Sequence, residues 1–164
     1  MKVLKHGFLI SFLLLVHNGL AQKKRFTIHF TYFQSYCEGA RPTPEMEAET
    51  KKAKAYANKT VVWVSAKGKI DSAKTNAEGI LILKLKKGIY SFYEDWRYYL
   101  DTPGDLDISN FDKTCLIEEW QKVTTLVTVT RKEVQIVPKN EIRSFCSFSL
   151  PCLLQNNVAP SRPN

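Results

Sequence analysis

Three aspartates in a turn-rich stretch could bind a hard cation. Asp101, Asp105 and Asp107 flank Pro103 and Gly104, and carboxylate oxygens on a loop are ligands that Ca²⁺ takes in proteins. The spacing does not fit an EF-hand, because neither the glycine nor the final glutamate of that loop follows Asp105 at the required distance. The pattern therefore predicts either a calcium site at these three aspartates or a solvated acidic loop that attracts the basic strands or a partner.

A dense group of aromatic residues precedes these aspartates. Trp96, Tyr98 and Tyr99 surround Arg97 and follow two acids in the sequence. Aromatic rings stack on the apolar faces of sugars, and neighbouring carboxylates accept hydrogen bonds from hydroxyl groups. We expect Trp96, Arg97, Tyr98 and Tyr99 to bind a ligand, either a glycan or a peptide, from an exposed loop. Packing of the same rings beneath this segment is the alternative.

The sequence contains none of the common catalytic motifs. It has no G-x-S-x-G elbow, no H-E-x-x-H pair and no phosphate-binding glycine loop. His29 is the one histidine after residue 21 and falls on the polar face of an expected strand, so it lacks the partners that a histidine site needs. We therefore predict that the protein is not an enzyme and uses no cofactor. A hydrolase that uses a pair of carboxylates, drawn from Glu94, Asp95 and the three aspartates, is the alternative.

The first 21 residues have the composition of a cleavable export signal. Lys2 and Lys5 precede an apolar run over 7–16, and residues 19–21 supply the small side chains that a signal peptidase accepts. We expect cleavage after Ala21 and a periplasmic or secreted protein without a transmembrane segment. A retained anchor is the alternative, although the apolar run reaches only about half of the roughly 20 residues that span a bilayer.

All four cysteines follow this segment, and an even number in an oxidising compartment predicts two disulfides. Three pairings are possible. We favour Cys146 with Cys152, across a short loop that contains Pro151, and Cys37 with Cys115. A zinc site with four thiolate ligands is the alternative, and the lack of a C-x-x-C pair disfavours it.

Short apolar runs separated by turn residues predict β-strands along most of the chain. The stretch 25–33 alternates apolar and polar residues, and 61–93 holds three apolar runs with glycine-containing turns, which is typical of an antiparallel meander. Alternation places Leu81, Leu83 and Leu85 on the core face. Further strands are expected at 123–130, 134–137 and 142–148. The pattern predicts an all-β fold, an antiparallel β-sandwich of about seven strands.

Two short helices are expected between strands. Thr43 can cap a helix that begins at Pro44, and glutamates near its start and lysines after them suit the helix dipole. A mobile loop is the alternative for this segment. Ser109 and Asp112 have the spacing of a capping box, so we expect a second helix over 110–121 that packs across the sheets.

Basic residues concentrate in the predicted meander, and the whole chain has a formal net charge of +8. Between positions 67 and 87 six lysines outnumber Asp71 and Glu78: Lys67, Lys69, Lys74, Lys84, Lys86 and Lys87. A solvated strand face that resists aggregation explains them. Binding to an anionic surface of lipid or polysaccharide is the alternative, and nucleic acid is disfavoured by the export signal.

Four segments of the meander carry a family resemblance. They are NKTVVWV at 58–64, DSAKTNAEG at 71–79, LIL at 81–83 and KGIY at 87–90. Together they resemble the carboxypeptidase regulatory-like domains of the transthyretin-like (prealbumin-like) group. The resemblance implies a non-catalytic β-sandwich module of the kind that accompanies enzymes, transporters and envelope proteins. A stand-alone exported version of such a domain resembles exported proteins of the bacterial envelope.

The chain departs from that group in its four cysteines and in two insertions, 37–57 and 94–121. Loops on a generic scaffold carry binding, so we expect function there. We predict an export signal at 1–21, a single β-sandwich domain at 22–154 and a disordered tail at 155–164. The expected protein is a non-catalytic binding module of the bacterial envelope with a protein, peptide or glycan partner. A structural component of an envelope assembly is the alternative.

Overall fold

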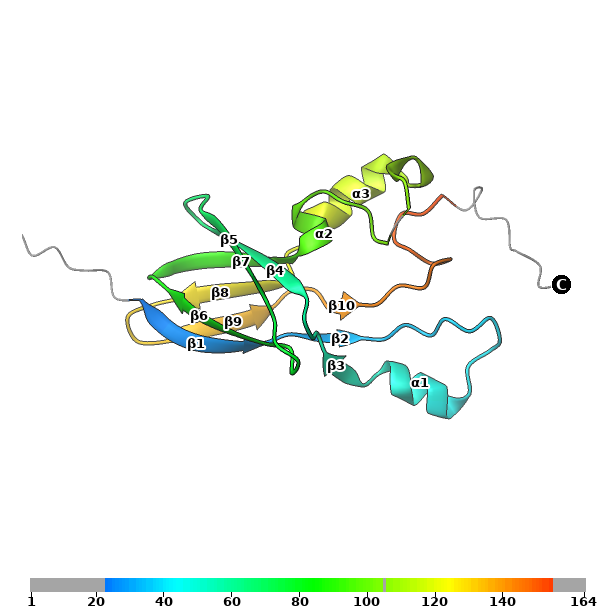
Figure 1. Ribbon diagram of the computed structural model, residues 1–164, viewed down its shortest axis with the longest axis horizontal. Coiled ribbons are helices and arrows are strands. Elements are labelled where there is room, and N and C mark those ends of the chain that lie inside the picture. The colour runs from blue at the N-terminus through cyan, green and yellow to red at the C-terminus, as the bar shows by residue number, and fades with distance from the viewer. Residues whose placement is uncertain (1–22, 105, 155–164) are drawn as a thin grey trace, which may run out of the picture.

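The computed structural model of the protein describes residues 23–104 and 106–154. In that part the chain forms two facing layers of β-strands, and the helices lie toward one end of them (Figure 1). The all-β sandwich that the sequence predicts is confirmed, with antiparallel strands predominating and only short helices. The expected export signal at 1–21 and the expected tail at 155–164 lie outside the described residues.

The larger layer is a five-stranded antiparallel sheet of order β5-β4-β7-β8-β9. Its strands are β4 (Thr60–Ser65), β5 (Ile70–Lys74), β7 (Gly88–Glu94), β8 (Thr125–Val129) and β9 (Val134–Pro138). The alternating burial along β7 and β8 shows that one face of this sheet is turned to the core and the other is more open to solvent.

The opposite layer consists of two smaller sheets. In the first, β1 (Lys24–His29) pairs antiparallel with β6 (Ile80–Leu85). In the second, β2 (Thr31–Phe33) lies between β3 (Ala53–Ala55) and β10 (Ile142–Arg143), antiparallel to the former and parallel to the latter. The predicted strand over 25–33 is therefore two strands.

The chain crosses between the layers around Gly79. The backbone amide of Phe30 donates to the Gly79 carbonyl at 2.8 Å, and the Phe30 carbonyl accepts from the Tyr56 amide at 3.0 Å. Gly79 has φ +73°, and a Cβ at this position would lie 2.4 Å from the Phe30 carbonyl oxygen, so only glycine fits. The predicted meander is wrong at this point, because β6 pairs with β1 rather than with β5.

The core lies between the two layers. Leu81, Leu83 and Leu85 are all buried, as the alternation predicts. They face Trp63 and Phe92 of the larger sheet, whose rings stack with centroids 5.6 Å apart. These contacts remove large apolar surfaces from water, and this hydrophobic burial is the main contribution that holds the two layers together.

Three α-helices and one 3₁₀ helix occur in the described residues: α1 (Pro44–Thr50), α2 (Asp95–Tyr98), η1 (Ile108–Asn110) and α3 (Lys113–Trp120). The Thr43 side chain caps α1, as predicted. The helix expected over 110–121 is shorter, because Phe111 is extended and Asp112, not Ser109, caps α3. No helix in the described part of the chain has the length and apolar character that crossing a bilayer requires.

Two disulfides are present, and their pairing differs from the one that the sequence favoured. Cys37 is bonded to Cys146, and Cys115 is bonded to Cys152. The first ties the start of the 37–57 insertion to the segment after β10, and the second ties α3 to the last described turn. The favoured pairing was wrong because β10 lies beside β2, which brings Cys146 next to Cys37 and leaves Cys152 to meet Cys115 of α3.

Candidate functional site

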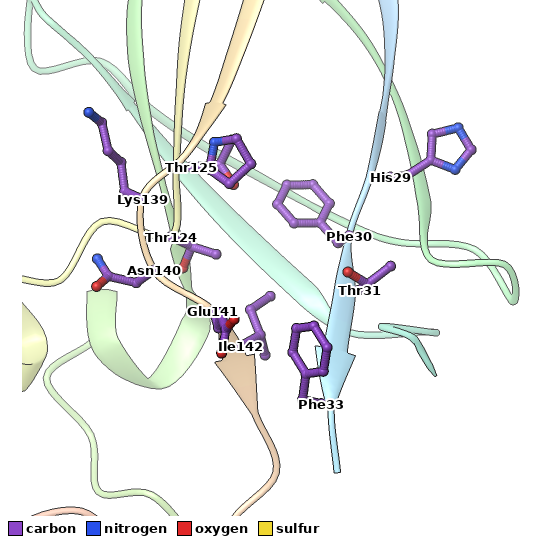
Figure 2. Close-up of a pocket in the computed structure, with 11 residues that line it drawn as sticks. His29, Phe30, Thr31, Phe33, Thr124, Thr125, Lys139, Asn140, Glu141 and Ile142 are labelled. Atoms are coloured by element: carbon purple, nitrogen blue, oxygen red, sulfur yellow. The ribbon is translucent and has the colours of Figure 1, made fainter. Parts of the chain in front are cut away.

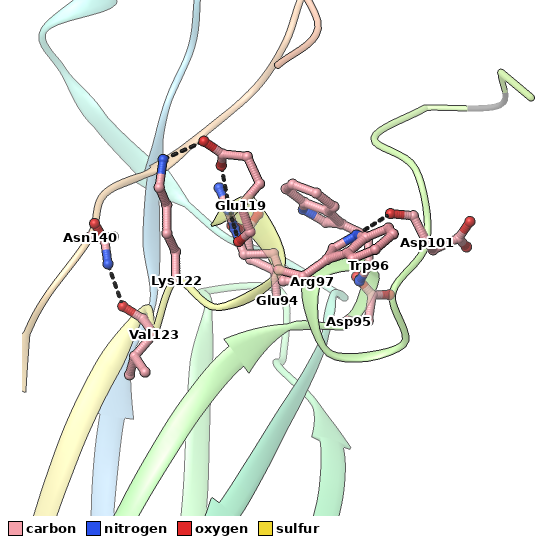
Figure 3. Close-up of polar contacts among 10 residues, drawn as sticks. Glu94, Asp95, Trp96, Arg97, Asp101, Glu119, Lys122, Val123 and Asn140 are labelled. Atoms are coloured by element: carbon pink, nitrogen blue, oxygen red, sulfur yellow. Dashed lines mark hydrogen bonds and ion pairs between the residues drawn. The ribbon is translucent and has the colours of Figure 1, made fainter. Parts of the chain in front are cut away.

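The guanidinium of Arg97 holds the 94–121 insertion onto the sandwich (Figure 3). Its Nε donates to Glu94 Oε2 at 3.0 Å, and its Nη1 donates to both the carbonyl and Oε2 of Glu119 at 2.6 Å. Arg97 is only 6% exposed. A guanidinium buried between two carboxylates is satisfied within the protein, so Arg97 positions α2 rather than offering its charge to a ligand.

The two carboxylates differ in their electrostatic surroundings. Burial raises the pKa of Glu94 above its ordinary value, and the hydrogen bond and charge of Arg97 only partly oppose that rise. Burial also acts to raise the pKa of Glu119, but hydrogen bonds from Lys122 and Arg97 outweigh it and hold that pKa below its ordinary value. Glu119 is therefore the firmly ionised partner of the network.

A cleft of about 480 Å³ lies beside α2. One side of it is formed by the small β10-β2-β3 sheet and by the residues that come directly after β3 and β10 in the chain. The other side is formed by the start of the 94–121 insertion and by Pro103 and Gly104. Both predicted insertions contribute to it, 37–57 through Ala55, Tyr56 and Ala57. The side chains with rings or charges that line it are Tyr32, Tyr56, Lys59, Glu94, Asp95, Trp96, Arg143 and Phe145.

Trp96 is the aromatic residue of the predicted ligand-binding group that lines this cleft. Its ring meets Phe145 edge to face with centroids 6.2 Å apart, and the Arg97 guanidinium lies 4.3 Å from its centroid. These contacts hold the ring in place before any ligand arrives. The half-buried Trp96 therefore provides a rigid apolar wall next to polar groups.

Tyr56 supplies a neutral hydroxyl at the same cleft. Burial raises the pKa of its hydroxyl, and the negative charges of Glu94 and Asp95 raise it further. The Tyr56 ring also meets Tyr32 edge to face, with centroids 6.4 Å apart. The hydroxyl stays protonated throughout the physiological range, so it can both donate and accept hydrogen bonds.

Tyr98 and Tyr99 lie apart from the residues that line the cleft. The Tyr98 ring packs against Tyr93 with centroids 6.0 Å apart, and Tyr99 meets Tyr98 edge to face at 5.3 Å. Tyr99 is 61% exposed. Of the four predicted ligand-binding residues, Trp96 thus lines the cleft and Arg97 holds the helix, while Tyr98 is half-buried and Tyr99 exposed, both outside the cleft.

The predicted calcium ligands fall on a segment with its own local hydrogen bonds. Asp101 and Asp107 are exposed, and Asp107 Oδ1 caps η1 by accepting from the Ser109 amide at 2.8 Å. Asp105 lies outside the described residues. Within the described residues no group of three or more His, Cys, Asp or Glu side chains is placed to hold a metal ion. His29 is exposed, as the strand pattern predicts.

Sequence reasoning missed Tyr32, Tyr56 and Phe145 as lining residues. Tyr32 and Phe145 fell within expected strands, where alternation cannot distinguish a ring in the core from a ring at the mouth of a cleft. Tyr56 is the penultimate residue of the 37–57 insertion, and no motif in the sequence around it indicated a binding role.

Comparison with protein-family models, with curated proteins and with solved structures finds no match to this chain. The resemblance to carboxypeptidase regulatory-like domains therefore stays a prediction that rests on the four quoted segments.

Proposed function

We propose that this protein is an exported, non-catalytic binding module of a bacterial envelope, and that an extracellular glycan binds in the cleft beside α2. The observation that carries this proposal is that both insertions, 37–57 and 94–121, line one cleft. Its volume of about 480 Å³ falls within the range of about 300–1,000 Å³ that small-molecule sites occupy. The resemblance to accessory β-sandwich domains supports a module whose specificity lies in its loops.

The chemistry of the lining supports a sugar ligand. Trp96 offers a fixed ring for the apolar face of a pyranose, and Tyr56 and Asp95 offer hydrogen-bonding groups beside it. Lys59 adds positive charge at the exposed rim of the same cleft, and Arg143 lies there in an ion pair with Glu141. A mixture of one rigid ring, neutral hydroxyl groups and both signs of charge suits a polar ligand such as a glycan with an acidic substituent.

A glycan array tests this proposal. The labelled protein, with both disulfides intact, is applied to oligosaccharides from bacterial envelopes and from animal and plant surfaces. Selective binding to a related set of glycans is the expected result. A parallel array of peptides is the comparison, and binding to peptides alone would replace the glycan by a peptide ligand.

The alternative function, a structural component of an envelope assembly, is supported by the unpaired edges of the sandwich. Among the described strands, β1 pairs only with β6 and β9 pairs only with β8. A cavity of about 320 Å³ lies between the end of β1 and the segment that joins β9 to β10, and Figure 2 shows Phe30 and Ile142 turned toward its interior. Unpaired edges of this kind accept a strand from another protein.

Cross-linking in an envelope extract separates the two functions. A photoreactive residue in place of Gln135, on the exposed edge strand β9, is expected to capture a defined protein if the assembly role is correct. Capture that is equal for the same probe at exposed Lys113 would argue against recognition through the edge.

A further inference from the structure

A further cavity of about 330 Å³ is lined by residues of the β4–β5 turn, the β6–β7 turn and the start of β1. Figure 1 shows these segments at the end of the sandwich away from α2 and α3. Six lysines and one acid, Asp71, line the cavity. The lysines are Lys23, Lys67, Lys69, Lys84, Lys86 and Lys87.

The fold brings these lysines together from distant positions. Ser65 of β4 is paired with Tyr90 of β7, which places the turn after β4 beside the turn before β7. The Ala66 amide donates to the Ile89 carbonyl at 2.9 Å and joins the two turns directly. Gly68, with φ +77°, closes the first turn. Backbone hydrogen bonds therefore fix the relative positions of the two turns that form the rim of the cavity.

The floor of the cavity is apolar and fixed. Trp63 is 6% exposed and stacks on Phe92 in the core. Tyr90 is 9% exposed, and its hydroxyl donates to the Lys86 carbonyl at 2.9 Å. That hydrogen bond fixes the Tyr90 ring and the β6–β7 turn relative to one another.

The positive charge at the rim has little compensation. All six lysines are exposed, and none takes part in an ion pair within residues 23–104 and 106–154. Like charges around a concave, apolar-walled site raise the local positive potential and attract anions. The repulsion among them is relieved when a multiply charged anion binds.

We propose that this cavity binds a phosphate monoester, with the phosphate among the lysines and the organic part against Trp63, Leu85 and Tyr90. A phosphate monoester carries a charge of about −1.5 to −2 at neutral pH and three acceptor oxygens, which suits several ammonium groups at one rim. A sulfate ester or a carboxylate brings one charge and gains less from the cluster. The phosphate can belong to a soluble sugar phosphate or to the headgroup of a lipid.

Isothermal titration calorimetry with glucose 6-phosphate tests the site, and glucose 6-sulfate is the matched ligand of lower charge. The cavity variants are Lys67→Gln/Lys69→Gln and Lys86→Gln/Lys87→Gln. The control variant is Lys51→Gln/Lys113→Gln, which removes two exposed charges near α1 and α3. We expect each cavity variant to bind glucose 6-phosphate about tenfold more weakly or worse, and 0.5 M NaCl to weaken the wild-type protein similarly.

The control variant should bind within about twofold of the wild-type protein, and glucose 6-sulfate should bind more weakly than the phosphate. Equal losses in the control and cavity variants would overturn the proposal, because net charge alone would then explain the binding. Equal affinity for the sulfate and the phosphate would overturn the assignment of a monoester. Backbone amide shifts confined to 66–69 and 86–89 on addition of glucose 6-phosphate locate the site without any substitution.

Vesicle co-sedimentation distinguishes the two sources of phosphate. Phosphatidylcholine vesicles with and without phosphatidic acid are the probes. Binding to the phosphatidic acid vesicles together with weak binding of glucose 6-phosphate supports a lipid headgroup, and the reverse supports a soluble ester. The proposal fails if neither probe binds, or if heparin binds and neither phosphate probe does.

Discussion

Arg97 and Glu119 are 22 residues apart in sequence, yet Arg97 Nη1 lies 2.6 Å from Glu119 Oε2. This ion pair joins α2 to α3 and is almost closed to solvent, with side-chain exposures of 7% and 14%. Because Trp96 precedes Arg97 in α2, the same contact fixes one wall of the cleft that we propose as the binding site. Stability and ligand binding are therefore linked at this helix.

Replacing Arg97 by methionine should destabilise the protein by about 3–5 kcal/mol, because Glu94 and Glu119 would lose a buried partner. Urea unfolding measures the change. The exposed pair of Arg143 and Glu141 gives the comparison, since Arg143→Met should change the free energy of unfolding by about 0.5 kcal/mol or less. An equal loss in the free energy of unfolding for the two variants would contradict the role of the buried Arg97 in holding α2 to α3.

The pair should also make stability depend on pH through Glu119. The pKa of Glu119 is lower in the folded protein than its ordinary value of 4.5, so its ionised form stabilises the fold above that pH. The contribution is lost as the pH falls through the folded-state pKa. The wild-type protein should therefore exceed Glu119→Gln in stability by more at pH 7 than at pH 3.

Urea unfolding of both proteins at the two pH values gives this difference. Glu94 has the opposite shift, but it is present in both proteins and its effect largely cancels. A difference that is the same at pH 7 and pH 3 would contradict the assigned role of Glu119.

The disulfide pairing can be read directly from peptides. Mass spectrometry of a non-reduced digest should recover Cys37 linked to Cys146 and Cys115 linked to Cys152. Replacing either pair by serines should cost about 2–5 kcal/mol, since each bond closes a long loop. A peptide that links Cys146 to Cys152 would contradict the fold around β10 and α3.

Gly79 is the glycine whose replacement should harm the fold most clearly. In Gly79→Ala the new Cβ would meet the Phe30 carbonyl oxygen at 2.4 Å, at a φ of +73° that alanine disfavours. The loss should exceed about 2 kcal/mol, because the strain and the clash add. Gly39→Ala, with nothing within 4 Å of its Cβ, is the control for thermal unfolding. Similar melting temperatures for the two variants would refute the tight crossing.

Local patterns predicted much of the fold. Leu81, Leu83 and Leu85 alternate with polar or exposed residues and are buried as expected, and Thr43 caps α1 because capping depends on residues close in sequence. The pairing of β6 with β1 could not be predicted in this way. The pairing depends on Gly79, where the chain passes to the other layer, and the spacing of apolar residues does not reveal such a crossing.

The candidate site was harder to predict for the same reason. The acidic and aromatic composition of 94–121 drew attention to this segment, and Trp96 in it lines a cleft. The sequence gives no sign that Arg97 is less exposed than Trp96. In the structure, however, Glu119 of α3 binds its guanidinium. Phe145 joins the cleft only because the segment that contains it follows β10, whose partner β2 lies far away in the chain.

The most direct test of the proposed function measures how tightly Trp96→Ala and Tyr99→Ala bind the oligosaccharide that the array selects. Trp96 lines the cleft and Tyr99 is exposed outside it, so the two variants remove aromatic rings from neighbouring turns of the same segment. Calorimetry should show a loss of about tenfold or more, ~1.4 kcal/mol, for Trp96→Ala and an unchanged affinity for Tyr99→Ala, with both variants folded. Unchanged affinity in Trp96→Ala, or an equal loss in both, would contradict the account.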